Sequence, residues 1–209
     1  MLKILHHPLI NIKLTAMRSK DTNHQEFRQN LNEIASLMVY ETLRDYQTKP
    51  MDVTTPLNKT YHGVTFEQEI VIIPILRAGL GMLTGILDLV PQARVGHIGM
   101  YRNEENDSVV EYFFKIPDVE KTANIIVVDP MLATGTSASD AISKLRSLGF
   151  TNIRLVCLVG VDKGLEKIQT EHPNVDIYLA AKDDYLNENN YIIPGLGDAG
   201  DRIFGTKGK

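Results

Sequence analysis

Several features are scarce in this chain of 209 residues, and each scarcity excludes a class of protein. The single cysteine, Cys157, allows neither an internal disulfide framework nor a cysteine-based metal cluster. No apolar run approaches the ~18 residues of a membrane span, and the N-terminal stretch lacks the continuous apolar core of a secretory signal. We therefore expect a cytoplasmic protein with no membrane partner.

An excess of basic residues is also missing, because 22 Lys and Arg stand against 26 Asp and Glu. Proteins that bind nucleic acid usually carry a basic face or run, and we find none, so we expect no nucleic-acid partner. A small anionic ligand remains open, since a few local donors can bind one. No repeat or low-complexity linker divides the chain, and its length predicts a single domain over 1–209.

From residue 69 onwards, apolar strands alternate with amphipathic helices. The apolar runs favour strands at 69–76, 93–102, 124–130, 152–160 and 175–181. The segments between them favour helices, and in the first of these Leu80, Leu83, Leu87 and Val90 would share one face. Uninterrupted apolar strands are typical of a parallel sheet covered on both faces, which binds ligands at the carboxyl ends of its strands. We therefore expect an α/β fold.

Two kinds of segment depart from this alternation. Apolar residues at helical spacing, after a capping signal at Thr22, predict a long N-terminal helix over about 21–48 that Pro50 would end. Two β-like runs around a polar turn predict a hairpin over about 99–116, and a second hairpin is indicated near residue 60. A projecting hairpin is either an arm that embraces another subunit or a surface excursion.

The stretch VVDPMLATGTS, residues 127–137, combines a strand end with a loop of small residues. The strand would deliver Asp129 to the carboxyl edge of the sheet, where Pro130 would prevent further ladder pairing. In the loop Ala133 to Ser137, backbone N–H groups and the start of the next helix would form a cradle for an anion. Gly135 would permit a positive φ there.

A carboxylate suits sugar hydroxyls or a divalent metal, and a cradle beside it suits a monophosphate, so together they describe a ribose 5-phosphate site. The loop is neither a Walker loop nor G-x-G-x-x-G, because it lacks both patterns. An acidic strand end before a helix cap also occurs without any ligand, and the spacing alone leaves that alternative open.

The same stretch, as IIVVDPMLATGTSASDA, resembles the phosphoribosyl-pyrophosphate signature of the type I phosphoribosyltransferases, in the form found in the uracil phosphoribosyltransferases. The segments PILRAGLGM, GMYRNEE and YIIPGLGDAGDRIFGTK are similar to further motifs of that family, and with HHPLI the resemblance covers nearly the whole chain. It implies a central parallel sheet flanked by helices, a projecting hairpin arm over about 99–116 and a uracil-binding loop over about 191–201. One departure is Thr136, where the family often has Gly; a β-branched residue disfavours positive φ and predicts a stiffer loop.

The reaction that the resemblance implies is the transfer of the phosphoribosyl group of phosphoribosyl pyrophosphate (PRPP) to N1 of uracil, giving UMP and diphosphate. The implied catalytic residues are Arg77 and Arg102, which would meet the diphosphate, and Asp129, which would hold the ribose hydroxyls. The implied PRPP contacts are Arg77, Arg102, Asp129, Pro130, Met131, Leu132, Ala133, Thr134, Gly135, Thr136, Ser137 and Asp198. The implied uracil contacts are Ile192, Gly197, Asp198 and Ala199. A backbone carbonyl facing uracil N3–H would reject cytosine, which lacks that proton.

Further implications of the resemblance concern cofactor and partners. Mg²⁺ would be held mainly by substrate oxygens, and the six scattered histidines suggest no protein metal site. A homo-oligomer, dimeric or larger, and GTP as an effector are implied by family members that have them. No general base is assigned. Two alternatives remain: an RNA-binding regulator with little catalysis, and a phosphoribosyltransferase for another base. The net charge of −4 disfavours the first, and the GLGDAGD loop disfavours the second.

Overall fold

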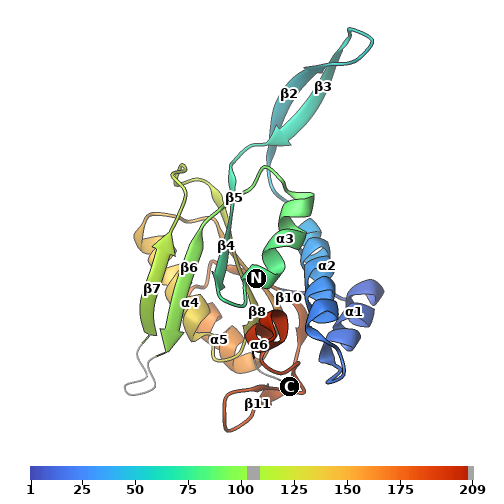
Figure 1. Ribbon diagram of the computed structural model, residues 1–209. Helices are drawn as coiled ribbons and strands as arrows, with labels where there is room; N and C mark the ends of the chain where they lie inside the picture. Colours follow the sequence, from blue (N-terminus) through green and yellow to red (C-terminus); the bar gives the residue numbers. More distant parts are fainter. Residues whose placement is uncertain (103–108, 207–209) are drawn as a thin grey trace.

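A computed structural model describes residues 1–102 and 109–206, and within them a central sheet has the strand order β1–β10–β9–β8–β4–β6–β7, with β5 beside β4 (Figure 1). The strands are β1 (Leu2–Ile4), β4 (Ile70–Leu76), β5 (Arg94–Val95), β6 (His97–Arg102), β7 (Val109–Lys115), β8 (Asn124–Leu132), β9 (Ile153–Gly160) and β10 (Asp176–Lys182). Every neighbouring pair is parallel except β6 and β7. The predicted α/β fold with a mostly parallel sheet is confirmed.

Helices cover both faces of this sheet (Figure 1). On one face lie α1 (Pro8–Arg18), α2 (His24–Thr42), α3 (Leu80–Leu89) and α6 (Ala199–Phe204), and on the other lie α4 (Thr136–Ser147) and α5 (Asp162–Glu171). None of the helices in the described part of the chain has the length and apolar character needed to cross a membrane.

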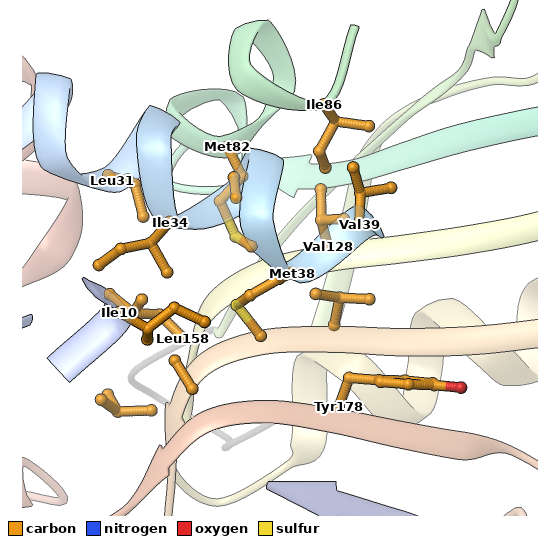
Figure 2. Packing of buried hydrophobic residues seen from close by; sticks show 14 of the residues in the cluster. Ile10, Leu31, Ile34, Met38, Val39, Met82, Ile86, Val128, Leu158 and Tyr178 are labelled. Atoms are coloured by element: carbon orange, nitrogen blue, oxygen red, sulfur yellow. The ribbon is translucent and has the colours of Figure 1, made fainter. Parts of the chain in front are cut away.

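Alternate residues of each inner strand enter the two cores. On β4, Ile70 and Ile72 pack beneath α2 and α3, whereas Val71 and Ile73 pack beneath α4. Figure 2 shows the first core, in which Met38 of α2 points toward the sheet. Each fully buried aliphatic side chain contributes about 1.5–3 kcal/mol. Because both faces of the inner strands are buried, these strands appear in the sequence as uninterrupted apolar runs.

The buried face of α3 differs from the prediction. Its deeply buried residues are Gly81, Met82, Gly85 and Ile86. Of the four residues predicted to share one face, Val90 is buried, whereas Leu80, Leu83 and Leu87 are only half-buried. The reason is close helix packing: a Cβ on Gly85 would lie 1.9 Å from the backbone oxygen of Asn32 in α2. Glycines bring the two helices together, and leucine spacing cannot reveal that.

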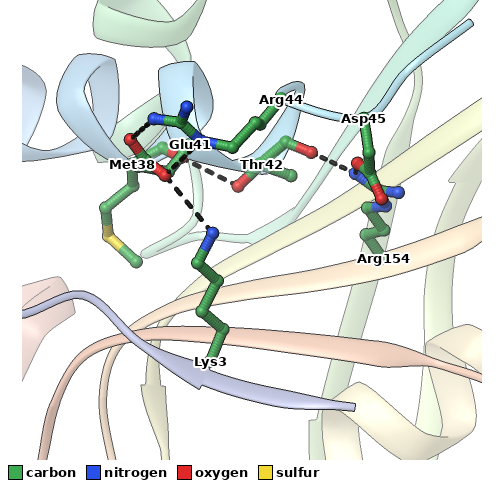
Figure 3. A network of polar contacts seen from close by, with 7 residues as sticks. All are labelled: Lys3, Met38, Glu41, Thr42, Arg44, Asp45 and Arg154. Atoms are coloured by element: carbon green, nitrogen blue, oxygen red, sulfur yellow. Dashed lines mark hydrogen bonds and ion pairs between the residues drawn. The ribbon is translucent and has the colours of Figure 1, made fainter.

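The predicted helix over 21–48 was too long at both ends. It begins at His24, where the Asn23 side chain accepts a hydrogen bond from the Glu26 N–H at 3.0 Å. It ends at Thr42, whose carbonyl accepts a hydrogen bond from Arg154 of β9 (Figure 3). Arg154 also pairs with Asp45 at 2.8 Å, which holds the turn after the helix. The helix end is thus set by a side chain more than a hundred residues away.

The hairpin that projects is β2 (Thr48–Thr54) with β3 (Thr60–Phe66), as Figure 1 shows. Pro50, predicted to stop a helix, pairs with Val64 within it. The hairpin predicted over 99–116 exists as β6 and β7. β6 pairs with β4 at Ile98 and Gly99, and the buried Ile98 side chain anchors this end of the hairpin in the central sheet. Residues 100–102 of β6 continue past Leu76, the last residue of β4. Its turn, 103–108, lies outside the described residues.

Candidate active site

The candidate site lies at the carboxyl ends of β4 and β8, which are neighbours in the sheet. A Cβ on Gly79, in the loop after β4, would lie 2.6 Å from the carbonyl oxygen of Val128 in β8. Only glycine permits this approach, and it places the Arg77 loop directly beside Asp129. The peptide bond between Leu76 and Arg77 is cis.

Asp129 is half-buried near the end of β8, three residues before the strand ends at Leu132. Desolvation raises the pKa of its carboxyl from 3.8 to about 7, and a 3.4 Å hydrogen bond from the Met131 N–H offsets this only in part. A cation or sugar hydroxyls at the carboxylate would favour its ionised form. The prediction that Pro130 ends pairing was wrong: β8 continues along β9 to Leu132, because a proline removes only its own N–H donor.

The predicted phosphate loop joins β8 to α4. Gly135 has φ +78°, as predicted, and its carbonyl accepts a hydrogen bond from the Ser139 N–H at 2.9 Å in the first helical turn. Thr136 is the first residue of α4 and does not have a positive φ, so the left-handed conformation falls on the glycine. Its hydroxyl oxygen lies 3.2 Å from that of Thr134. Two hydroxyls and free helical N–H groups thus gather at one point, which suits an anion.

Arg77 connects this edge of the sheet to the C-terminal segment. Its side chain is 58% exposed, with Nη2 4.0 Å from Asp201 Oδ1 and the guanidinium 5.7 Å from the centre of the Phe204 ring. These loose contacts leave the guanidinium free to turn toward a ligand. Arg102, the other predicted arginine, is the last residue of β6, and its side chain lies outside the described residues.

The predicted uracil loop runs from β12 (Ile192–Ile193), which pairs with β11 (Tyr185–Leu186), to the start of α6. The Asp198 side chain caps α6 by accepting a hydrogen bond from the Asp201 N–H at 2.8 Å. Gly197 has φ +78°, and Ala199 is buried at the first position of the helix. The loop lies beside Arg77, since a Cβ on Gly200 would be 3.9 Å from Arg77 Nη2.

Sequence reasoning missed the residues that hold this loop in place. Arg18 at the end of α1 donates to both oxygens of buried Asp183, at 2.8 and 2.5 Å, and to the Gly195 carbonyl at 2.7 Å. Asp183 in turn accepts from the Gly195 N–H at 3.0 Å. Arg202 donates to the Leu196 carbonyl at 2.8 Å, and burial lowers its pKa. The loop backbone is therefore clamped from both sides.

Within residues 1–102 and 109–206, no group of three or more His, Cys, Asp or Glu side chains is placed to hold a metal ion. Asp129 offers a desolvated carboxylate, which fits an ion whose other ligands come from a substrate.

Comparison with known proteins identifies the family of this chain. The model of the uracil phosphoribosyltransferase family matches residues 4–206. The uracil phosphoribosyltransferases of Metamycoplasma hominis (72% identity, 99% of each chain) and Metamycoplasma arthritidis (67%, 100% of each) are similar along their whole length. A solved structure from Aquifex aeolicus has a TM-score of 0.94 at 35% identity over all of both chains. A hypoxanthine phosphoribosyltransferase of Staphylococcus aureus (TM-score 0.51, 13% identity, 76% of each chain) shares the fold. This chain belongs to the uracil phosphoribosyltransferase family.

Proposed function

We propose that this chain makes UMP by transferring the phosphoribosyl group of PRPP to N1 of uracil at the carboxyl ends of β4 and β8. The observation that carries the proposal is the pairing of the desolvated Asp129 carboxylate with the loop that Gly135 turns into α4. The curated relatives named above carry the name of this enzyme. None of these observations supports the RNA-binding alternative.

In this reaction the bond from the anomeric carbon to diphosphate breaks and a bond to uracil N1 forms, while N1 loses its proton. Positive charge develops on the ribose, as in other glycosyl transfers. The enzyme must therefore stabilise the leaving diphosphate and position the base, and it needs no protein nucleophile. Arg77 would turn from Asp201 to the diphosphate, and Arg102 would join it. The acceptor of the N1 proton stays unassigned.

The sugar phosphate would lie along the loop. Asp129 would accept hydrogen bonds from the ribose hydroxyls, and its Pro130, Met131 and Leu132 neighbours would form the wall beside them. The backbone N–H groups from Ala133 to Ser137 would bind the 5-phosphate, with hydroxyls at Thr134 and Thr136. Asp198, within reach of the same edge, would add a contact from the C-terminal loop.

Uracil would be read by backbone groups of Ile192 and of Gly197 to Ala199. Because Arg18 and Arg202 clamp this loop, its N–H and carbonyl groups are held in fixed directions. Fixed groups discriminate well, since cytosine would leave a buried carbonyl facing no donor. We expect a preference for uracil over cytosine of about 10⁴-fold or more in kcat/KM.

Mg²⁺ is the proposed cofactor. Asp129 is the residue that would contact it or the ribose oxygens around it, and the remaining ligands would be oxygens of PRPP. The ion would neutralise charge on the departing diphosphate.

The proposed assembly is a homo-oligomer in which the β2–β3 hairpin reaches a second subunit. Met51, Val53, Tyr61 and Val64 are exposed on this hairpin, and an apolar projecting arm is typical of a subunit contact. Sedimentation of the chain with and without residues 50–64 tests this. GTP as an effector and a cytoplasmic location stay predictions; kinetics with added GTP and cell fractionation test them.

The experiment is to incubate the purified chain with labelled uracil, PRPP and Mg²⁺, and with cytosine in place of uracil. We expect UMP with uracil, little product with cytosine, and none with EDTA. Equal turnover of cytosine would refute the proposed reading of the base loop, and UMP formation in EDTA would refute the metal.

A further inference from the structure

Helix α5 touches the loop of the proposed phosphate site at its start and the helix after that loop at its end. The loop follows Leu132, the last residue of β8, which pairs with Gly160 of β9, and leads into α4 at Thr136. Val161, just before α5, donates its N–H to the Leu132 carbonyl at 3.2 Å. α5 then runs alongside α4, and the two helices belong to the same apolar core. Helix α5 therefore contacts the loop from the side.

The first contact is at Gly164, in the first turn of α5. A Cβ on Gly164 would lie 2.7 Å from the Ala133 carbonyl oxygen and 2.9 Å from that of Leu132. From the other side, a Cβ on Gly135 would lie 2.8 Å from the Gly164 carbonyl oxygen. Two backbones therefore meet with no side chain between them. Any side chain at Gly164 would push against backbone atoms of the loop, which cannot rotate away.

The second contact is at His172, the residue that ends α5. Its ring is buried, with 4% of the residue exposed, and Nε2 lies 3.1 Å from the Ser139 carbonyl oxygen and 2.9 Å from the Ser139 hydroxyl oxygen. A carbonyl oxygen only accepts hydrogen bonds, so Nε2 carries the proton and donates it. The Ser139 hydroxyl donates to Glu171 of the same helix end. Ser139 also donates its backbone N–H to Gly135, which links this contact to the loop.

We propose that Gly164 and His172 are positioning residues for PRPP: α5 fixes the phosphate loop by backbone contact at Gly164 and fixes the first turn of α4 through His172. The inference rests on the proposed function and adds residues to it. A binding loop is effective when its geometry is held before the ligand arrives. The second support acts on the helix whose N-terminal N–H groups would meet the phosphate. Loss of either support would weaken PRPP binding more than uracil binding, because the uracil loop is held separately by Arg18.

The test compares steady-state kinetics of Gly164→Ala, His172→Leu and His172→Gln with the unaltered chain. A shift of the loop by an ångström is enough to cost on the order of 10- to 100-fold. We expect Gly164→Ala and His172→Leu to raise KM for PRPP by about tenfold or more, with KM for uracil changed less than about twofold. His172→Gln retains an N–H donor near the position of Nε2 and should restore most of the PRPP affinity.

Gln169→Ala, an exposed change on α5, is the matched control and should leave both KM values unchanged. The thermal unfolding temperature of each variant shows whether a change in KM comes from a shifted loop or from a less stable fold. Alanine favours a helix more than glycine, so a merely local effect of Gly164→Ala would stabilise α5 and leave KM for PRPP alone. An unchanged KM for PRPP in Gly164→Ala would overturn the inference. So would an equal rise in the KM values for PRPP and uracil, or a failure of His172→Gln to restore PRPP affinity. If the unaltered chain makes no UMP, the proposed function fails first, and this inference fails with it.

Discussion

Replacing Asp129 with Asn should stabilise the ligand-free protein at neutral and alkaline pH while removing its activity. The carboxylate lies where water is largely excluded, with one long hydrogen bond from a backbone N–H. Folding therefore opposes its ionisation, and an amide of the same shape avoids that cost. A carboxylate that destabilises the ligand-free protein but is required for activity is expected where its partners arrive with the substrate.

The size of the effect follows from the pKa. The carboxyl pKa is 3.8 in the unfolded chain and about 7 in the folded protein. At ~1.36 kcal/mol per unit, a difference of this size is worth at most about 4 kcal/mol. Asp129 keeps some contact with solvent, which lowers the expected gain to about 1–4 kcal/mol. Because the folded state holds the proton more tightly, the stability of the unaltered protein relative to Asp129→Asn falls between about pH 4 and pH 7 and is constant above.

Urea unfolding at pH 4, 6 and 8, without substrate or metal, measures this difference. The two proteins should have equal free energies of unfolding at pH 4, and the variant should be the more stable at pH 8. Glu166→Gln, an exposed change on α5, should show no such trend. A pH-independent difference, or a variant less stable at pH 8, would refute the argument that desolvation dominates at this carboxylate.

Three further predictions concern the supports of the site. Arg18→Leu leaves buried Asp183 without its partner, so urea unfolding should show a loss of about 3–5 kcal/mol, and a loss below about 1 would mean that the pair is not a clamp. Gly135→Ala should raise KM for PRPP by about tenfold or more, since a Cβ meets a backbone oxygen of α5 at 2.8 Å and adds to strain at φ +78°. Gly149→Ala is its control: φ there is +93°, but the added Cβ would make only an ordinary contact with the Lys121 side chain at 3.8 Å. Equal effects of the two changes on KM for PRPP would show that the contact with α5 does not matter. Arg77→Lys should raise KM for PRPP by roughly tenfold, because an ammonium lacks the guanidinium fork, and an unchanged KM would remove Arg77 from the diphosphate site.

The sheet and the glycine turn between β8 and α4 could be predicted because their signals are local. Strands buried on both faces appear as apolar runs, and a strand, an acid, a glycine turn and a helix follow one another within fifteen residues. Gly135 illustrates this well: the positive φ that the pattern predicts is the one that the structure has.

The remaining features depend on contacts between distant segments. Arg18 and Asp183 lie 165 residues apart, and in the sequence each resembles an ordinary surface charge. The end of α2 depends on Arg154 in β9, and the buried face of α3 depends on glycines that carry no hydrophobic signal. Hairpins at 48–66 and 97–115 look alike in sequence, and only pairing with β4 decides which one joins the sheet.

The rate of UMP formation from uracil, PRPP and Mg²⁺ by the unaltered chain and by Asp129→Ala tests the central claim most directly. If the strand end and loop at 127–137 form the sugar-phosphate site, the unaltered chain makes UMP and the variant, still folded by circular dichroism, loses at least about 10²-fold in kcat/KM. No UMP from the unaltered chain, or equal rates from the two proteins, would contradict the account.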